Sequence, residues 1–239
     1  MTYPWRKPQF YVNTDWFGRQ EDATAVAGRL SRHLSALVSA DRTLASWSVG
    51  ATREMPYGAV RPDLTSLVSD DIVRSEDGEV VDGAGYRVSC VSQDPAQYYM
   101  IVGTAGSRYP PPLSSGLIFK TISNDEADPA IVTYRLMKAV MLATIGCWEP
   151  DFCIARSNQI DPDYEHEGQY TKAWMTYVPP AHVGDVDPVG VPFLERTPDG
   201  GLLLSATQEI FRPENPAHLE GATRISQALQ PLNAVLPRT

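Results

Sequence analysis

The 239-residue sequence predicts an α+β fold in which helices pack on a mainly antiparallel sheet. Two observations support this prediction: strand-like segments follow one another without intervening helices, and turn signals that suit hairpins separate several of them. Few segments could form the strand-helix-strand units that a parallel sheet requires. We expect one domain over residues 1–239, with an ordered core from about 8 to 232, and an arrangement in two similar halves remains open.

The amino-terminal third of the chain alternates between strand and helix patterns. Residues 8–16 place β-branched and aromatic side chains at near-alternate positions, which predicts a half-buried strand. Between residues 21 and 38, apolar side chains recur every three or four positions and predict a helix with one buried face. The next expected elements are a strand, a connection with Pro and Gly, and a short helix: 44–49, 52–62 and 63–73.

Strands separated by short turns dominate the remainder of the chain. Turns are predicted at residues 76–78 and 82–85, where Gly78 and Gly83 each follow an aspartate. The expected strands are 86–92, 98–103, 117–123, 152–156, 171–178, 191–197 and 201–207. The last two flank Pro198-Asp199-Gly200, a hairpin turn whose glycine can adopt positive φ.

Two further helices are predicted from cap and proline signals. The first runs from Pro129 to Cys147 with Asp128 as its N-cap, and its apolar residues surround nearly the full circumference, which is typical of a buried central helix. The second begins at Asn215-Pro216 by the same logic, and Pro231 is expected to stop it.

The charge of the chain is acidic and unevenly distributed. Its net charge is −9, from 20 basic and 29 acidic residues. Residues 70–82 and residues 149–167 each hold six acidic residues against one arginine. Such a surface disfavours nucleic acid, because Lys and Arg contacts to phosphates supply most of that affinity. A basic protein is therefore the expected partner.

These two acidic segments supply the predicted partner-binding residues, with Tyr164 as an aromatic anchor. They are Asp70, Asp71, Glu76, Asp77 and Glu79 in the first segment, and Asp161, Asp163, Tyr164, Glu165 and Glu167 in the second. The alternative interpretation is that both segments only keep the domain in solution.

A search for catalytic, metal or cofactor motifs gives no strong match. The carboxylates and His166 within residues 161–167 could bind a hard cation, but the segment lacks the twelve-residue calcium-loop pattern. Residues 103–107 follow a strand without the lysine of a phosphate-binding loop, and no GxSxG motif occurs. We therefore expect no catalytic residue, no metal and no cofactor.

Cysteine and histidine usage suggests structural roles. Three cysteines without a CxxC pair are expected to pack in the core: Cys90, Cys147 and Cys153. His33, beside the apolar stripe of its helix, is expected to be an interface or partly exposed residue rather than a metal ligand. No apolar stretch has the length of a signal peptide or a membrane span, so we expect a cytoplasmic protein without a membrane partner.

Several segments together resemble the immunity protein 52 family of bacterial polymorphic toxin systems, over roughly residues 8–232. The residues that carry the resemblance are Asp41–Ser48 with Gly50–Glu54, Tyr86–Ser89, Thr197–Leu204, Asn215-Pro216 and Ala228–Asn233. These motifs are structural: we expect Trp47 in the core, Gly200 and Gly201 in a turn, and Asn215 as a helix cap.

The resemblance implies a single-domain antitoxin encoded beside a toxin, often a nuclease of restriction-endonuclease-like fold that a contact-dependent secretion system delivers. It supplies no catalytic residues. Two other classes stay open: a hydrolase or small-molecule-binding enzyme with a dispersed site, and an adaptor subunit of a secretion apparatus. The oligomeric state is not predicted.

Overall fold

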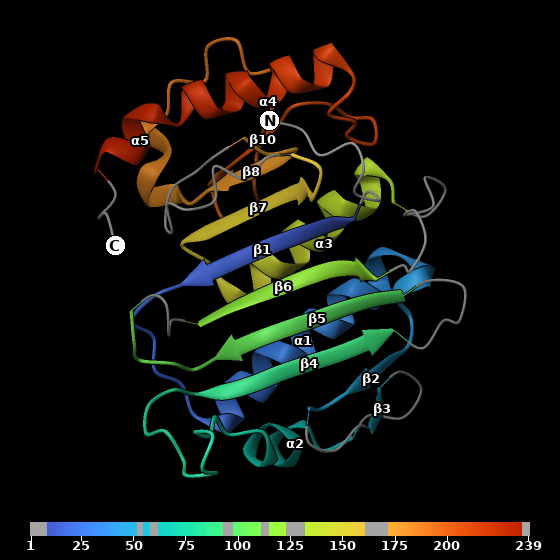
Figure 1. Cartoon of the computed structure of the whole chain (residues 1–239), viewed down its shortest axis with the longest axis vertical. Coiled ribbons are helices and arrows are strands. Elements are labelled where there is room, and N and C mark those ends of the chain that lie inside the picture. The colour runs from blue at the N-terminus through green and yellow to red at the C-terminus, as the bar shows by residue number, and fades with distance from the viewer. Residues whose placement is uncertain are drawn as a thin grey trace. The chain divides into compact units, whose positions relative to one another are not determined.

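The computed structural model describes residues 9–51, 55–57, 62–92, 98–110, 115–122, 132–160 and 172–235. Ten strands, five α-helices and two short 3-10 helices lie within these ranges, and the pairings established between strands are antiparallel (Figure 1). The predicted α+β class is confirmed.

The chain divides into two compact units, which we describe separately. The N-terminal unit comprises residues 13–122 and 143–150, and the C-terminal unit comprises residues 1–12, 123–142 and 151–239. Two elements contribute residues to both units: strand β1 (Phe10–Trp16) and helix α3 (Tyr134–Trp148).

The N-terminal unit contains a sheet of five successive strands in the order β3-β2-β4-β5-β6. The strands are β2 (Trp47–Val49), β3 (Met55–Tyr57), β4 (Tyr86–Ser92), β5 (Tyr98–Ala105) and β6 (Ser115–Ile122). Its helices are α1 (Ala23–Ala40), the 3-10 helix η1 (Arg42–Leu44) and α2 (Leu64–Asp70).

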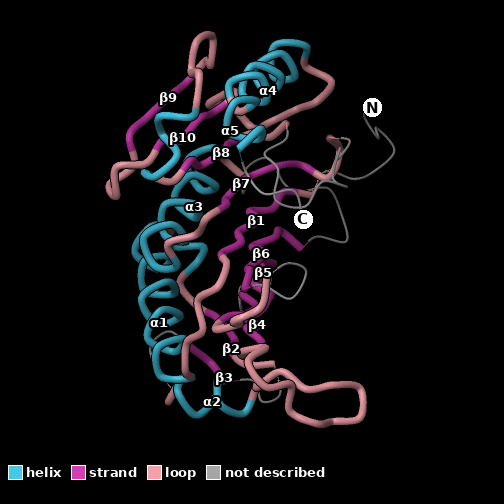
Figure 2. The backbone as a smooth tube through the Cα atoms, turned by 90° about the vertical axis from the view of Figure 1, so that its left-hand side faces the viewer, coloured by secondary structure: helices cyan, strands magenta, loops and turns pink. Residues whose placement is uncertain are grey.

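Hydrophobic periodicity accounts for the packing of this unit. Strand β4 alternates buried and less buried residues, as expected when one face of a sheet is covered. Helix α1 begins where the Asp22 carboxylate accepts the Ala25 N–H at 2.8 Å, and it buries one apolar stripe. Figure 2 shows α1 on one side of β4, β5 and β6. Trp47 is fully buried and its indole N–H donates to the Leu44 carbonyl, so its predicted core position is confirmed.

The C-terminal unit contains a sheet in the order β7-β8-β10-β9. The strands are β7 (Phe152–Ser157), β8 (Met175–Val178), β9 (Phe193–Arg196) and β10 (Leu202–Ser205). Its remaining helices are the 3-10 helix η2 (Pro180–Asp185), α4 (Pro216–Ala228) and α5 (Gln230–Val235).

The central strands of this sheet are buried on both faces. Every residue of β8 and β10 is buried, which is the pattern of strands with packed layers above and below. Helix α4 packs closely against the end of β10. A Cβ on Gly221 would lie only 2.5 Å from the carbonyl oxygen of Ala206, the residue that follows β10. Glycine at position 221 therefore sets the approach of helix to sheet. Asn215 caps α4 by accepting the Ala217 N–H, as predicted.

The bounds of several helices and strands differ from the predictions. Helix α3 begins at Tyr134, later than predicted, where the Thr133 hydroxyl accepts the Leu136 N–H; Asp128 and Pro129 lie outside the described residues. The predicted strand 44–49 is reduced to β2, because Asp41 caps the 3-10 turn η1.

Helix α4 ends at Ala228, before Pro231 as predicted, but a further short helix, α5, then begins at Gln230 and was not predicted. Pro231 lies in the first turn of α5, where proline is tolerated because its missing N–H would have no intrahelical acceptor. The short strand β3, within the predicted connection 52–62, was also not predicted.

Candidate partner-binding surface

Residues 73–81, here called the acidic hairpin, form a tight β-hairpin in the N-terminal unit (teal in Figure 1). The Ser75 N–H donates to the Glu79 carbonyl at 2.8 Å, and the Gly78 N–H donates to the Ser75 carbonyl at 3.0 Å. Gly78 has a φ of +83°, which glycine adopts at no steric cost. The Arg74 guanidinium closes the turn by donating to the Gly78 carbonyl. This is a three-residue connection with fixed geometry.

The tip of the acidic hairpin presents three carboxylates to solvent: Glu76, Asp77 and Glu79. Among the residues that the structure describes, none of the three side chains has a hydrogen-bond or ion-pair partner. The next acid, Asp82, differs because Arg108 pairs with it at 2.9 Å. The turn thus carries three carboxylates against the single guanidinium of Arg74, a local charge of −2 that attracts a basic surface.

The two aspartates before the hairpin have different environments. Asp70 is exposed at the end of α2. Asp71 is only 2% exposed, and its carboxylate accepts the Ala51 N–H at 2.6 Å. Its backbone N–H donates to carbonyls of α2, and its carbonyl accepts the Arg87 N–H. Asp71 therefore joins three segments of the unit, and the expectation of an exposed contact at this position is corrected.

The second predicted acidic segment lies beyond the part of the chain that the structure describes. Asp161, Asp163, Tyr164, Glu165 and Glu167 all lie outside the described residues, as does the candidate cation ligand His166. Within the described residues, no group of three or more His, Cys, Asp or Glu side chains is arranged to hold a metal ion.

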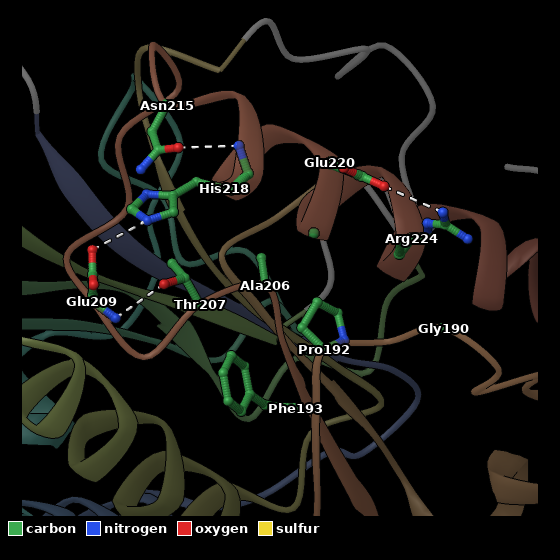
Figure 3. Close-up of a pocket in the computed structure, with 12 residues that line it drawn as sticks. Gly190, Pro192, Phe193, Ala206, Thr207, Glu209, Asn215, His218, Glu220 and Arg224 are labelled. Carbon is green, nitrogen blue, oxygen red and sulfur yellow. Dashed lines mark hydrogen bonds and ion pairs between the residues drawn. The ribbon is translucent and has the colours of Figure 1, made fainter.

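A cavity of about 640 Å³ opens in the C-terminal unit beside α4, the start of β9 and the segment after β10 (Figure 3). Charged and polar side chains line part of it: Thr207, Glu209, Asn215, His218, Glu220 and Arg224. Sequence reasoning missed this cavity, because its residues come from three separate segments that carry no motif.

His218 is the only imidazole lining this cavity, and both of its ring nitrogens are engaged. Its Nδ1 accepts the Arg212 N–H at 3.1 Å, which leaves the proton on Nε2, 3.4 Å from the Glu209 carboxylate. The Glu209 side chain itself is 79% exposed. This arrangement holds the Glu209 carboxylate beside the His218 Nε2–H and leaves the carboxylate largely exposed to solvent.

The buried histidine and cysteines have structural environments. His33 is 1% exposed, which corrects the expectation of a partly exposed residue, and its Nε2 lies 3.1 Å from the Thr144 hydroxyl. Burial lowers the pKa of His33 to about 3, so the ring is neutral. All three cysteines are free and buried, as predicted, and burial raises the pKa of Cys90 to about 12.

No helix among the described residues combines the length and the apolar character needed to cross a bilayer.

A known protein family matches nearly the whole chain. The family model described as Immunity protein 52 matches residues 8–238. No curated protein matches the chain. Among solved structures, a Pseudomonas aeruginosa T6SS protein, PA0821, is similar with a TM-score of 0.47 and 8% sequence identity, over 93% of this chain and 73% of that one.

Proposed function

Because the chain belongs to the immunity protein 52 family, we propose that it binds a cognate toxin and neutralises it by stoichiometric association, without catalysis of its own. The observation that supports this proposal is the acidic hairpin: a turn of fixed geometry that holds three carboxylates without internal partners. Folding alone does not explain such a cluster, because like charges held together repel one another.

A basic toxin is the partner that this surface fits best. We propose a nuclease, since a nuclease needs a positively charged groove for its phosphate substrate. An acidic protein can occupy or flank that groove, and charge complementarity speeds the encounter. The exposed carboxylates Asp70, Glu76, Asp77 and Glu79 form the proposed contact in the N-terminal unit.

The second acidic segment, residues 161–167, remains part of the proposal with Tyr164 as its anchor. We further propose that the protein acts in the cytoplasm of the producing cell, where a toxin would otherwise reach its target.

Co-expression tests the proposed function. Cells that express the toxin encoded beside this gene should survive when the immunity protein is present, and the two proteins should co-purify at a one-to-one ratio. A catalytically inactive toxin serves as the binding control, because it separates association from any enzymatic repair of damage. Loss of both rescue and co-purification would contradict the proposal.

The acidic hairpin is tested by neutralisation. The triple variant Glu76→Gln, Asp77→Asn, Glu79→Gln should slow toxin association at low salt and leave thermal stability unchanged, because these side chains make no internal contacts. Asp71→Asn is the contrasting variant, since it should destabilise the fold. An unaltered association rate in the triple variant would remove the hairpin from the interface.

A further inference from the structure

The outer edge of the C-terminal sheet is formed by β9, which pairs with β10 and is the last strand in the order. In its register, Thr197 faces Gly201 and the Thr197 N–H donates to the Gly201 carbonyl. Hydrogen bonding in an antiparallel ladder alternates along each strand. The backbone N–H and C=O groups of Glu195 and Phe193 therefore also point toward β10. The N–H and C=O groups of Leu194 and Arg196 therefore point outward, and none of them has a partner among the described residues.

Apolar side chains accompany this open edge. Val189 is 83% exposed, Leu194 is 42% exposed and Phe193 is 37% exposed. Phe193 and Leu194 are consecutive residues of an extended strand, so their side chains lie on opposite faces, and each face of the edge carries one exposed apolar side chain. An edge strand with apolar side chains and unpaired backbone groups is a template for a further strand.

The opposite outer strand in the order, β3, shows how an edge can be protected. Proline occupies its central position, Pro56, and proline supplies no N–H to a neighbouring strand. In β9, proline occurs only before the strand, at Pro192, while Leu194 keeps its outward N–H. Arg196, the one basic residue of β9, is turned back to donate to the Gly200 carbonyl of its own hairpin.

The cavity begins where this edge begins, since Pro192 and Phe193 line it (Figure 3). Its carboxylates are Glu209, held beside the His218 Nε2–H, and Glu220, which pairs with Arg224 at 3.2 Å. The cavity therefore has one carboxylate more than it has arginines, and the Glu209 carboxylate is largely exposed. A lysine or arginine side chain is the complement to this site.

From this geometry we propose that β9 receives an extended segment of the toxin as an added antiparallel or parallel strand, with a basic side chain of that segment entering the cavity beside Glu209. This inference rests on the proposed function for the identity of the partner. Backbone hydrogen bonds from Leu194 and Arg196 would supply affinity, and the cavity would supply specificity, as in other cases of strand addition.

A second copy of this chain fits the same edge less well. In such a dimer the approaching strand is β9 itself, and its one basic side chain, Arg196, already donates to the Gly200 carbonyl of its own hairpin. A second copy therefore brings no available basic side chain of β9 to the Glu209 site, whereas a basic toxin supplies one.

The test uses Leu194→Pro and Leu194→Ala in the full chain. The proline variant removes the outward N–H without touching the ladder to β10, and the residue before it is already extended, as proline requires. We expect at least a tenfold weaker affinity for the inactive toxin in Leu194→Pro, with a smaller loss in Leu194→Ala. Circular dichroism melting should show that the proline variant remains folded.

Glu209→Arg tests the cavity without altering the edge. It should weaken toxin binding about tenfold or more, whereas Glu214→Arg, an exposed acid nearby on the same segment, should have little effect. Unchanged affinity in both Leu194→Pro and Glu209→Arg, while the wild type binds the toxin, would overturn this inference and leave the proposed function intact. A wild-type dimer in light scattering that Leu194→Pro dissociates would assign the edge to a second copy instead.

Discussion

The acidic hairpin and the β9–β10 hairpin are built on the same turn, but they use its carboxylate differently. In both, the N–H of a glycine at positive φ donates to the residue three positions earlier, and the preceding arginine donates to the glycine carbonyl. In the β9–β10 hairpin, Asp199 accepts hydrogen bonds from Thr197, Tyr177 and the Gly201 N–H. The equivalent Asp77 has no such partner among the described residues. The Asp199 carboxylate therefore stabilises the β9–β10 turn, whereas the Asp77 carboxylate remains available to a binding partner.

The largest expected effect is on stability. Asp199→Ala removes the acceptor of three hydrogen bonds and should lower the free energy of unfolding by about 2 kcal/mol. Asp77→Ala, at the equivalent turn position, should change it by less than about 0.5 kcal/mol. Urea denaturation of both variants measures the difference. Equal losses would mean that the two hairpins do not differ in the way described.

The next effect is on the rate of association. Reversing the hairpin charges with Glu76→Lys, Asp77→Lys and Glu79→Lys should slow binding of the inactive toxin about tenfold at low salt. Because exposed charges are screened, the difference should largely disappear at high ionic strength. Stopped-flow or surface-binding kinetics at two salt concentrations provide the measurement. A slower rate that is independent of salt would point to a steric cause.

A smaller effect should be common to both hairpins. Gly78→Ala and Gly200→Ala each place a side chain at positive φ and should cost about 1 kcal/mol of unfolding free energy. Gly146→Ala in α3 is the matched control: its added Cβ meets no atom within 4 Å and its φ is not positive, so it should be neutral or slightly stabilising. Melting temperatures compare the three variants.

The smallest effect is in the pH dependence. Burial alone would raise the pKa of Asp199, but its hydrogen bonds outweigh burial, and the pKa lies below the ordinary value. The stabilisation is therefore fully present above the pKa of the unfolded chain and is lost as pH falls through the lower pKa of the folded protein. The stability difference between wild type and Asp199→Asn should accordingly shrink below about pH 4. A difference that grows under acid would contradict this linkage.

Local chemistry in the sequence was sufficient to predict most of the helices and strands and the cap of α4. Strand β4 was predicted with its observed bounds, and Asn215 and Gly200 have the predicted roles because cap and turn geometry depend on a few neighbouring residues. Long-range contacts were not predictable in this way. Asp71 looked like its acidic neighbours, yet the fold brings Ala51 to its carboxylate, a distance of twenty positions along the chain.

The proposed binding surfaces, too, could be predicted only where a local sequence pattern specifies them. The high density of acidic residues in the sequence pointed to the acidic hairpin, because a local excess of acidic residues can be read directly from composition. The β9 edge was predicted as a strand, but its position at the end of the sheet depends on the pairing of β10 with both β8 and β9. The cavity beside it needs α4 and the segment after β10 to meet, which no local pattern specifies.

The three buried thiols make the native protein suitable for selective labelling. Cys90 and Cys153 are fully buried and the pKa of Cys147 is raised, so reagents that attack thiolates should leave the folded chain unmodified. A single cysteine introduced at Asp77 would then be the one reactive position, and a fluorophore attached there could report the arrival of a binding partner in real time.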